Sequence, residues 1–527
     1  MKHIKVASAP LNNGYLSLLA VSFLLPFSLC IWQFVDADFG RSLLSPLPFS
    51  DASLYHYSAW YKSVFFSESY VSEIIVFSPY ERLLTGLFKL FGHTTITPFV
   101  FNAVLSGLTC MALVTITLQL FSLRSAWVAL GIYCFTTPIL FFSGVTLKSS
   151  LVLFLTIAAI LMAILFFKRR NNYFALAFCV LILVASIDRV HVLVGLVIYF
   201  IFLCWPCADR NHTRQYRRTA LVLLLFISVA YGASSVRYGA EPKYVSSVGL
   251  NIYIGHSAPD NFLLKVPGIR NHIIGHRVDS KRLAERNAQR TLSQAEFSQA
   301  EVTQYWLSKT TDYIKHNPTA YLRGQGQKLH HLFAAQSNSS VSERAYLWRG
   351  ERWPLRFTFI DFALIFALFS VAVVVLFRQA SISRQQGFLL AFCLLYLLSV
   401  MTTIVTERYR LIGLVCMIPM AAWAVIYLCE NIKRGWRLFV LGFVVFASSQ
   451  FLAYTAPAQY QAQFDKHLSL EKRAHNGRYS EFQAAKQKLE SDPSYESCME
   501  FKRQLSRNKF SFDLRRTQQG CMMLRKN

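Results

Sequence analysis

The chain has 527 residues, of which 54% are hydrophobic and only 16% are charged. Soluble proteins carry about 25% charged residues, so these values exclude an ordinary soluble domain. Apolar runs of about 20 residues recur along the chain and predict an all-α polytopic membrane protein. The net charge of +26 is better explained by cytoplasmic loops that face anionic lipid than by a nucleic-acid partner.

The first apolar run, 16–34, has no clear small-residue cleavage site, and it predicts a retained span rather than a removed signal. Hydropathy along the chain predicts about eleven spans. Their bounds are 16–34, 97–121, 125–142, 149–167, 173–188, 191–206, 219–237, 357–377, 387–405, 411–429 and 437–455. Basic loops such as Lys168–Arg170 and Lys433–Arg434 then share one side, which predicts a cytoplasmic amino terminus.

The opposite side receives three long polar segments. We expect 1–455 to form the membrane domain, with 35–96 and 238–356 as its large outer loops. Residues 456–527 then form a small extracytoplasmic tail. The length of 238–356 suggests a folded segment that acts on something presented at the membrane.

Helical signals lie within two of these segments. The apolar residues after Pro79 recur with helical spacing but are interrupted by charge, which predicts a helix lying in the membrane interface. Residues 280–335 are also predicted to be helical, with Pro318 at an early helical position after His316 and Asn317.

Nine of the eleven cysteines lie in or beside apolar runs, where they are expected to act as small hydrophobic residues. Cys204 and Cys207 form an isolated CWPC pair, a weak signal for metal or redox chemistry. In the tail, Cys498 and Cys521 either form a disulfide, if the tail is extracytoplasmic, or remain free thiols.

The first outer loop carries a candidate general base. Asp51, Tyr55 and Ala59 are spaced by four residues and share one face of a helix. Asp51 would be a base near the membrane surface, although Ser50 or Asp51 would equally serve as a helix N-cap. Two further acidic candidates lie closer to the first span: Asp36 and Asp38.

A second set of candidates is cationic. Its members are Lys148, Arg189, Lys328, Arg408 and Arg410. Lys148 and Arg189 lie in short outer turns, where basic residues are disfavoured. They either anchor the spans by snorkelling or bind an anion, and arginine offers a fork that matches phosphate.

Histidines form the third set, and none of their spacings resembles a closed zinc site. The candidate histidines in the large outer segment are His256, His272, His276, His330 and His331. A divalent metal ion held by Asp51 and a donor phosphate remains open.

Several motifs together resemble the GT-C class of bacterial polyprenyl-phosphate-sugar glycosyltransferases, including the superfamily of protein O-mannosyltransferases and lipid A aminoarabinose transferases. The motifs are DxxxYxxxA at 51–59, SPYERLLTGLFKLFG at 78–92, GLNIYIGHSAP at 249–259, HNPTAYLRGQGQKL at 316–329, Glu343, and ERYRLIGLVCMIP at 407–419. The sequence departs from the GT-C pattern at two places. It has Ser-Pro-Tyr at 78–80 where Tyr-Pro is more usual, and it has Lys148 in a turn that often carries an acidic residue.

The resemblance implies a GT-C-like bundle in a bacterial inner membrane, with its active site in the periplasm. It implies an inverting transfer of sugar from a polyprenyl-phosphate donor to a glycan, lipid or protein acceptor, with Asp51 as the base. The five cations would bind the donor phosphate. The substrate-binding candidates are Tyr55, Tyr253, His256 and Glu343. The alternatives are a transporter or flippase of lipid-linked sugars, a class often built from paired halves, and an O-antigen polymerase or ligase.

Overall fold

The computed structural model describes most of the apolar part of the chain. The described residues are 13–35, 78–92, 96–205, 214–225, 246–257, 299–334, 358, 360–379, 382–403, 405–431 and 436–454, with single positions at 55, 59, 63, 488, 496, 499 and 500. Within them the regular structure is helical, apart from one isolated parallel bridge between Thr136 and Ile360. The predicted all-α class is confirmed, whereas the tail domain falls almost entirely outside the described residues.

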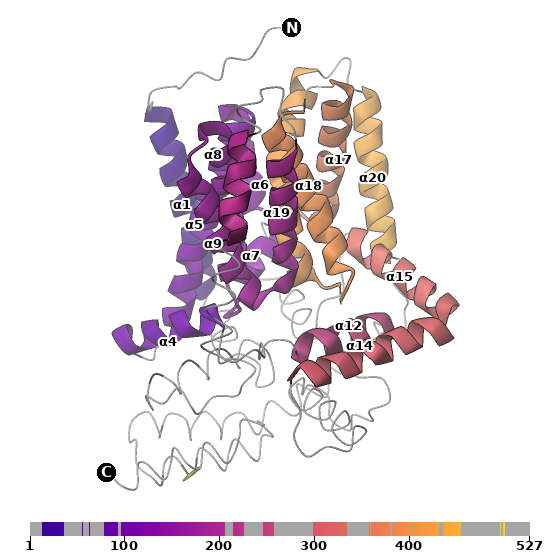
Figure 1. Cartoon of the computed structure of the whole chain (residues 1–527). Coiled ribbons are helices and arrows are strands. Elements are labelled where there is room, and N and C mark those ends of the chain that lie inside the picture. Colours follow the sequence, from indigo (N-terminus) through magenta and orange to yellow (C-terminus); the bar gives the residue numbers. More distant parts are fainter. Residues whose placement is uncertain are drawn as a thin grey trace.

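Apolar helices pack side by side into one bundle (Figure 1). They are α1 (Asn13–Val35), α5 (Ile96–Leu120), α6 (Leu123–Cys134), α7 (Thr137–Ser143), α8 (Ser149–Arg169), α9 (Asn172–Asp188), η2 (Val190–Leu193), α10 (Val194–Cys204), α17 (Phe362–Arg378), α18 (Arg384–Val400), α19 (Glu407–Glu430) and α20 (Trp436–Tyr454). Four of them, α1, α5, α8 and α19, are long and apolar enough to cross a membrane. Most bounds agree with hydropathy within a few residues, and the total of eleven spans stays a prediction.

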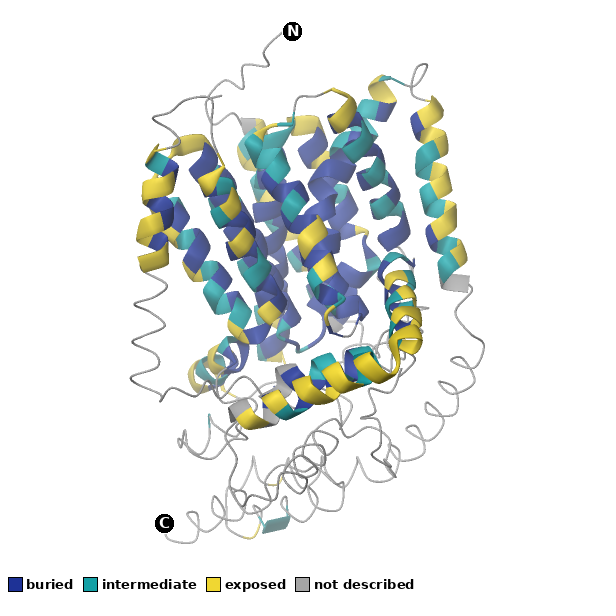
Figure 2. Cartoon of the chain, turned by 45° about the vertical axis from the view of Figure 1, so that its right-hand side comes forward, coloured by how far each residue is buried: buried dark blue, intermediate teal, exposed yellow. Residues whose placement is uncertain are grey.

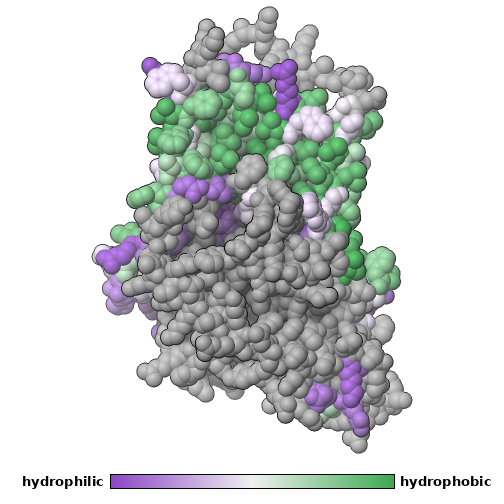
Figure 3. Space-filling view, turned by 180° about the vertical axis from the view of Figure 1, so that it is seen from behind, coloured by the Kyte–Doolittle hydropathy of each residue, from purple (hydrophilic) through white to green (hydrophobic). Residues whose placement is uncertain are grey.

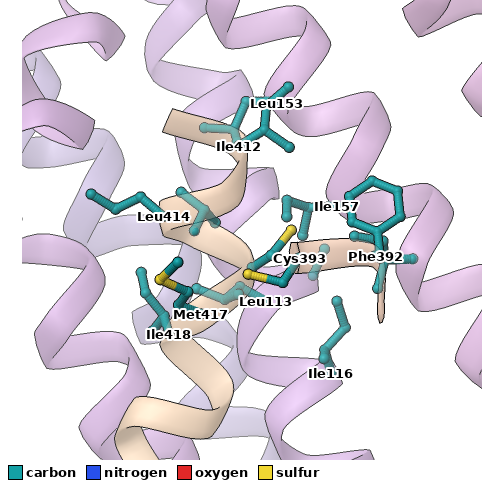
Figure 4. Close-up of a cluster of buried hydrophobic side chains, with 14 of the residues drawn as sticks. Leu113, Ile116, Leu153, Ile157, Phe392, Cys393, Ile412, Leu414, Met417 and Ile418 are labelled. Carbon is teal, nitrogen blue, oxygen red and sulfur yellow. The ribbon is translucent and has the colours of Figure 1, made fainter. Parts of the chain in front are cut away.

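Apolar side chains occupy both the inside and the outside of this bundle. In its centre, Leu113 of α5, Ile157 of α8, Cys393 of α18 and Met417 of α19 meet (Figure 4). Hydrophobic side chains cover the described part of its flank (Figure 3). Phe443 of α20, for example, is 70% exposed. An exterior as apolar as the interior is expected where the solvent is lipid.

The predicted span 125–142 contains two helices rather than one continuous helix. The structure has α6 and α7 there, separated at Phe135 and Thr136. Pro138 is the second residue of α7 and has no N–H to continue the earlier helix. The exposed backbone groups pair with a distant strand-like residue: Thr137 N donates to Ile360 O at 3.1 Å, and Ile360 N donates to Phe135 O at 3.1 Å.

Several of the predicted basic loops meet at one end of the bundle. Arg124 lies 3.3 Å from Glu430, Lys168 donates to Gln119 at 2.8 Å, and Arg384 donates to the carbonyl of Trp205 at 3.0 Å. These contacts join the ends of α5, α6, α8, α10, α18 and α19, as helices of alternating direction require.

Four further helices lie across the opposite end (Figures 1 and 2): α4 (Pro79–Phe91), α12 (Ser246–Ser257), α14 (Gln299–His316) and α15 (Pro318–Phe333). The helix predicted after Pro79 is confirmed, with Ser78 as its N-cap. Pro318 opens α15 as expected, because its fixed φ suits a first turn that needs no N–H. This end of the bundle holds the candidate site.

Candidate functional site

The carboxylate of Asp188, the last residue of α9, organises the first group of polar residues. Its Oδ1 accepts a hydrogen bond from Ser78 Oγ at 2.7 Å, and its Oδ2 accepts one from Tyr80 N at 3.4 Å. Lys148 Nζ lies 3.8 Å from Oδ1. We call Ser78, Tyr80, Lys148 and Asp188 the Asp188 cluster. The charge of the predicted phosphate ligand Lys148 is balanced here by a buried carboxylate.

Tyr55, a predicted substrate residue, packs against this cluster. Its ring meets Tyr80 edge to face at 5.7 Å, and Lys148 Nζ lies 5.9 Å from its centroid. Both Tyr55 and Ala59 are helical and buried, as a shared helix face predicts. Other predicted residues lie outside the described part of the chain: Asp51, Asp36, Asp38 and Glu343.

Arg189 follows Asp188 directly but belongs to a second group, the Arg189 cluster of Ser149, Arg189, Arg408 and Tyr409. Arg189 is only 4% exposed. It donates to the carbonyl of Arg408 at 2.6 Å and to Ser149 Oγ at 3.4 Å, and its guanidinium lies 4.7 Å from the Tyr409 ring. Among the described residues, no group accepts a hydrogen bond from its Nε and no carboxylate pairs with its guanidinium. A buried charge left in this state is costly, so the cluster favours an anion.

The helices around Arg189 add to this positive potential. Ser149 and Arg408 lie in the first turns of α8 and α19, so both helix N-termini reach the cluster. The amino-terminal end of a helix carries about half a positive charge and exposes unpaired N–H groups. Arg408 itself is 9% exposed, and its guanidinium lies 5.5 Å from the centroid of the same Tyr409 ring. The arrangement suits a phosphate group.

Lys328 and His256 join the outer helices to the bundle. Lys328 Nζ of α15 donates to the carbonyl of Met401 at 2.8 Å and lies 3.4 Å from His256 Nδ1 of α12. Gln325 Nε2 donates to the same ring nitrogen at 2.8 Å. Burial lowers the pKa of Lys328 to about 7, and burial together with the nearby Lys328 ammonium lowers the pKa of His256 to about 4. We call His256, Gln325, Lys328 and Met401 the Lys328 cluster. Its contacts hold α12 and α15 against the turn after α18.

Stability should therefore depend on pH through Lys328. In the unfolded chain its pKa is near 10.5, so the unfolded state binds more protons between about pH 7 and 10.5. Stability contributed by this site then rises with pH across that window. We expect the melting temperature of the wild type, relative to Lys328→Met, to increase between about pH 6 and about pH 9 in detergent. A difference that stays constant with pH would contradict the buried, depressed pKa.

Two glycines of the GLNIYIGHSAP motif allow α12 to dock closely. A Cβ on Gly255 would collide with the backbone of Thr403, and one on Gly249 would lie 2.8 Å from the carbonyl oxygen of Thr303 in α14. Between them, the ring of Tyr253 packs against Trp306 at 5.0 Å, and burial raises the pKa of Tyr253. The motif therefore serves helix packing, and the described contacts of Tyr253 are with α14.

Arg410 has a different environment from Arg408. It is fully buried, its Nη1 donates to the carbonyls of residues 331, 332 and 334, and its Nη2 donates to Glu407 at 2.7 Å. Its guanidinium also lies 3.9 Å from the Phe362 ring. These contacts join the end of α15 to α17 and α19, which favours a structural role. Phosphate binding by Arg410 stays a prediction.

The described residues contain no group of three His, Cys, Asp or Glu side chains that could hold a metal ion. Asp51, His272, His276, Cys207, Cys498 and Cys521 lie outside those residues, so the divalent ion, the CWPC pair and the tail disulfide stay untested. Six cysteines are buried free thiols, as expected of small hydrophobic residues: Cys30, Cys110, Cys134, Cys179, Cys393 and Cys416.

Sequence reasoning missed three residues that organise this end of the bundle. Asp188 carried a usable signal, because an ionisable residue at the end of an apolar helix is rare and marks a functional position. Tyr409 lies between two arginines in the ERYR motif. His191 contacts Thr403 Oγ1 at 3.0 Å and meets the Tyr409 ring edge to face, but an isolated histidine gives no such signal.

No protein-family model matches this sequence, and no curated protein matches it. The described residues are mostly helical and include four helices that could cross a membrane. The geometry adds a buried cationic site at the end of the bundle covered by α4, α12, α14 and α15.

Proposed function

We propose that the protein is a glycosyltransferase of GT-C type that moves a sugar from a polyprenyl-phosphate carrier to a glycan, lipid or protein acceptor. The observation that carries this proposal is Arg189, a buried guanidinium without a carboxylate partner among the described residues, placed beside two helix N-termini. A polyprenyl donor keeps its tail among the apolar helices and its phosphate at their ends. The resemblance of the first-loop and outer-segment motifs points to the same chemistry.

In the proposed reaction, the acceptor oxygen attacks the anomeric carbon while the bond from that carbon to the phosphate oxygen breaks. The phosphate leaves with the electron pair, and Arg189 and Arg408 stabilise the charge that develops on it. Asp51 takes the proton of the acceptor hydroxyl. Direct displacement inverts the anomeric centre. Tyr55, which follows Asp51 by four residues in the sequence, packs against Lys148, which supports a position of Asp51 near this end of the bundle.

The site would face the periplasm of a bacterial inner membrane, with the basic end of the bundle in the cytoplasm. This orientation is supported by Arg124, Lys168 and Arg384 at that end, because basic residues collect on the cytoplasmic side of membrane proteins. The tail 456–527 would then be periplasmic as well.

Binding of polyprenyl monophosphate to the purified protein in nanodiscs tests the proposal. Arg189→Gln should weaken binding by roughly 10- to 150-fold, because a hydrogen bond to a charged group contributes about 1.5–3 kcal/mol. Arg384→Gln is the matched control: Arg384 also donates to a carbonyl and lies over an aromatic ring, Tyr216 at 4.6 Å, but at the opposite end. Equal affinities of wild type and Arg189→Gln would exclude this phosphate site.

The alternative functions predict different outcomes in the same system. A flippase would move the lipid-linked sugar across the bilayer without forming a glycosylated acceptor. An O-antigen polymerase or ligase would use a glycan attached to a carrier as its donor. Sugar transfer from a polyprenyl-phosphate monosaccharide distinguishes the proposed enzyme from both.

A further inference from the structure

We propose that Asp188 is a positioning residue that fixes the first outer segment of the chain at the end of the bundle. It holds the N-terminus of α4 directly, and it holds Tyr55 through the contacts of that ring with Lys148 and Tyr80. The effect on catalysis rests on the proposed function, whereas the anchoring itself does not.

The first turn of α4 is satisfied by Asp188. A helix leaves its first N–H groups without partners inside the helix. Ser78 caps Glu81 N and donates its own hydroxyl proton to Asp188, Pro79 has no N–H, and Tyr80 N donates to the second carboxylate oxygen. Tyr80 is fully buried, so loss of Asp188 would leave its N–H buried without this acceptor.

A second set of hydrogen bonds holds α4 through the hydroxyl of Tyr80. The Tyr80 hydroxyl donates to Asn102 Oδ1 at 3.3 Å, and Asn102 Nδ2 donates to the carbonyl of Val145 at 2.8 Å. Val145 lies three residues before Lys148, whose ammonium returns to Asp188. The contacts therefore form a closed circuit through α4, α5, the turn before α8 and the end of α9.

Asp188 directly precedes Arg189 in the chain, so this set of contacts lies next to the proposed phosphate ligand. Asp188 and Arg189 are neighbours, yet the first binds the α4 anchor and the second belongs to the cationic cluster. One helix end thus fixes both the first outer segment and the proposed phosphate ligand. Asp188 also balances the charge of Lys148, whereas no carboxylate among the described residues pairs with the buried Arg189.

Hydrogen–deuterium exchange of the full-length protein in nanodiscs tests the anchor without any substrate. Asp188→Ala should accelerate exchange of the amides at the start of α4 by roughly tenfold, as expected for loss of a helix cap, and Asp188→Asn should do so less because it keeps one acceptor oxygen. Ser122→Ala is the matched control, because Ser122 also caps a helix, α6, through the amide three residues on, at the opposite end of the bundle. If Asp188→Ala does not fold, Ser78→Ala should give the same local acceleration.

Unchanged exchange of α4 in both Asp188→Ala and Ser78→Ala, or equal acceleration throughout the chain, would overturn the anchor. A kinetic measurement then tests its consequence: Asp188→Asn should lower kcat for sugar transfer with little change in the KM for the donor. A fall caused only by lost folded protein would disappear when rates are expressed per folded molecule. If no donor supports transfer by the wild type, the proposed function fails while the exchange result still decides the anchor.

Discussion

Asp51→Asn should lower the rate of sugar transfer by about 10²–10⁴-fold, the usual contribution of a general base. Asparagine keeps the size of the side chain but cannot accept the proton of the acceptor hydroxyl. Binding of polyprenyl monophosphate should be unchanged, because the proposed phosphate ligands are Arg189 and Arg408. Initial rates with a polyprenyl-phosphate sugar and the measured Kd together check this prediction.

The control for Asp51→Asn is Asp312→Asn, which removes an exposed carboxylate of α14 at the same end of the bundle and should leave the rate unchanged. Near-normal transfer by a well-folded Asp51→Asn protein would remove Asp51 as the base. Asp36 and Asp38 would then be the next residues to replace.

Arg410→Met should destabilise the protein by about 3–5 kcal/mol, because it removes one partner of a buried ion pair. Glu407 would keep its charge, and the carbonyls at the end of α15 would lose their donor. Thermal unfolding in detergent should show a large loss for Arg410→Met and almost none for Arg437→Met, which replaces an exposed arginine of α20.

The same variant separates two roles of Arg410. A structural residue gives low stability with normal donor affinity in the fraction that remains folded. Wild-type stability combined with weakened binding of polyprenyl monophosphate would instead assign Arg410 to the phosphate site, as the sequence motif suggests.

Hydropathy and proline position determine most of what could be predicted about the fold. Apolar runs locate the bundle helices, because a helix in contact with lipid needs apolar side chains. Pro79 and Pro318 mark helix starts, because the fixed φ of proline suits the first turn of a helix. Pro138 is a sequence signal for the interruption at Phe135 and Thr136, but its hydrogen-bond partner Ile360 lies far along the chain and could not be predicted.

The sequence indicates which residue types belong to the candidate site, but it does not indicate which way each side chain points. Charge in short outer turns identified Lys148 and Arg189. Arg408 and Arg410, however, are two residues apart in a helix, so their side chains differ by roughly 200° around its axis. Only the packing of α15 and α17 determines which arginine is enclosed among carbonyls and which lies beside Arg189.

The break between α6 and α7 bears on the order in which the chain is made. Thr137 donates its hydroxyl proton to the carbonyl of Thr358, 221 residues further along, next to the two backbone bonds with Ile360. During synthesis, these groups of the first half have no native partner until the second half enters the bilayer. Unpaired backbone groups in lipid cost several kcal/mol each. A nascent chain released before residue 358 should therefore be an incomplete bundle with unpaired polar groups between α6 and α7, a natural substrate for membrane quality control.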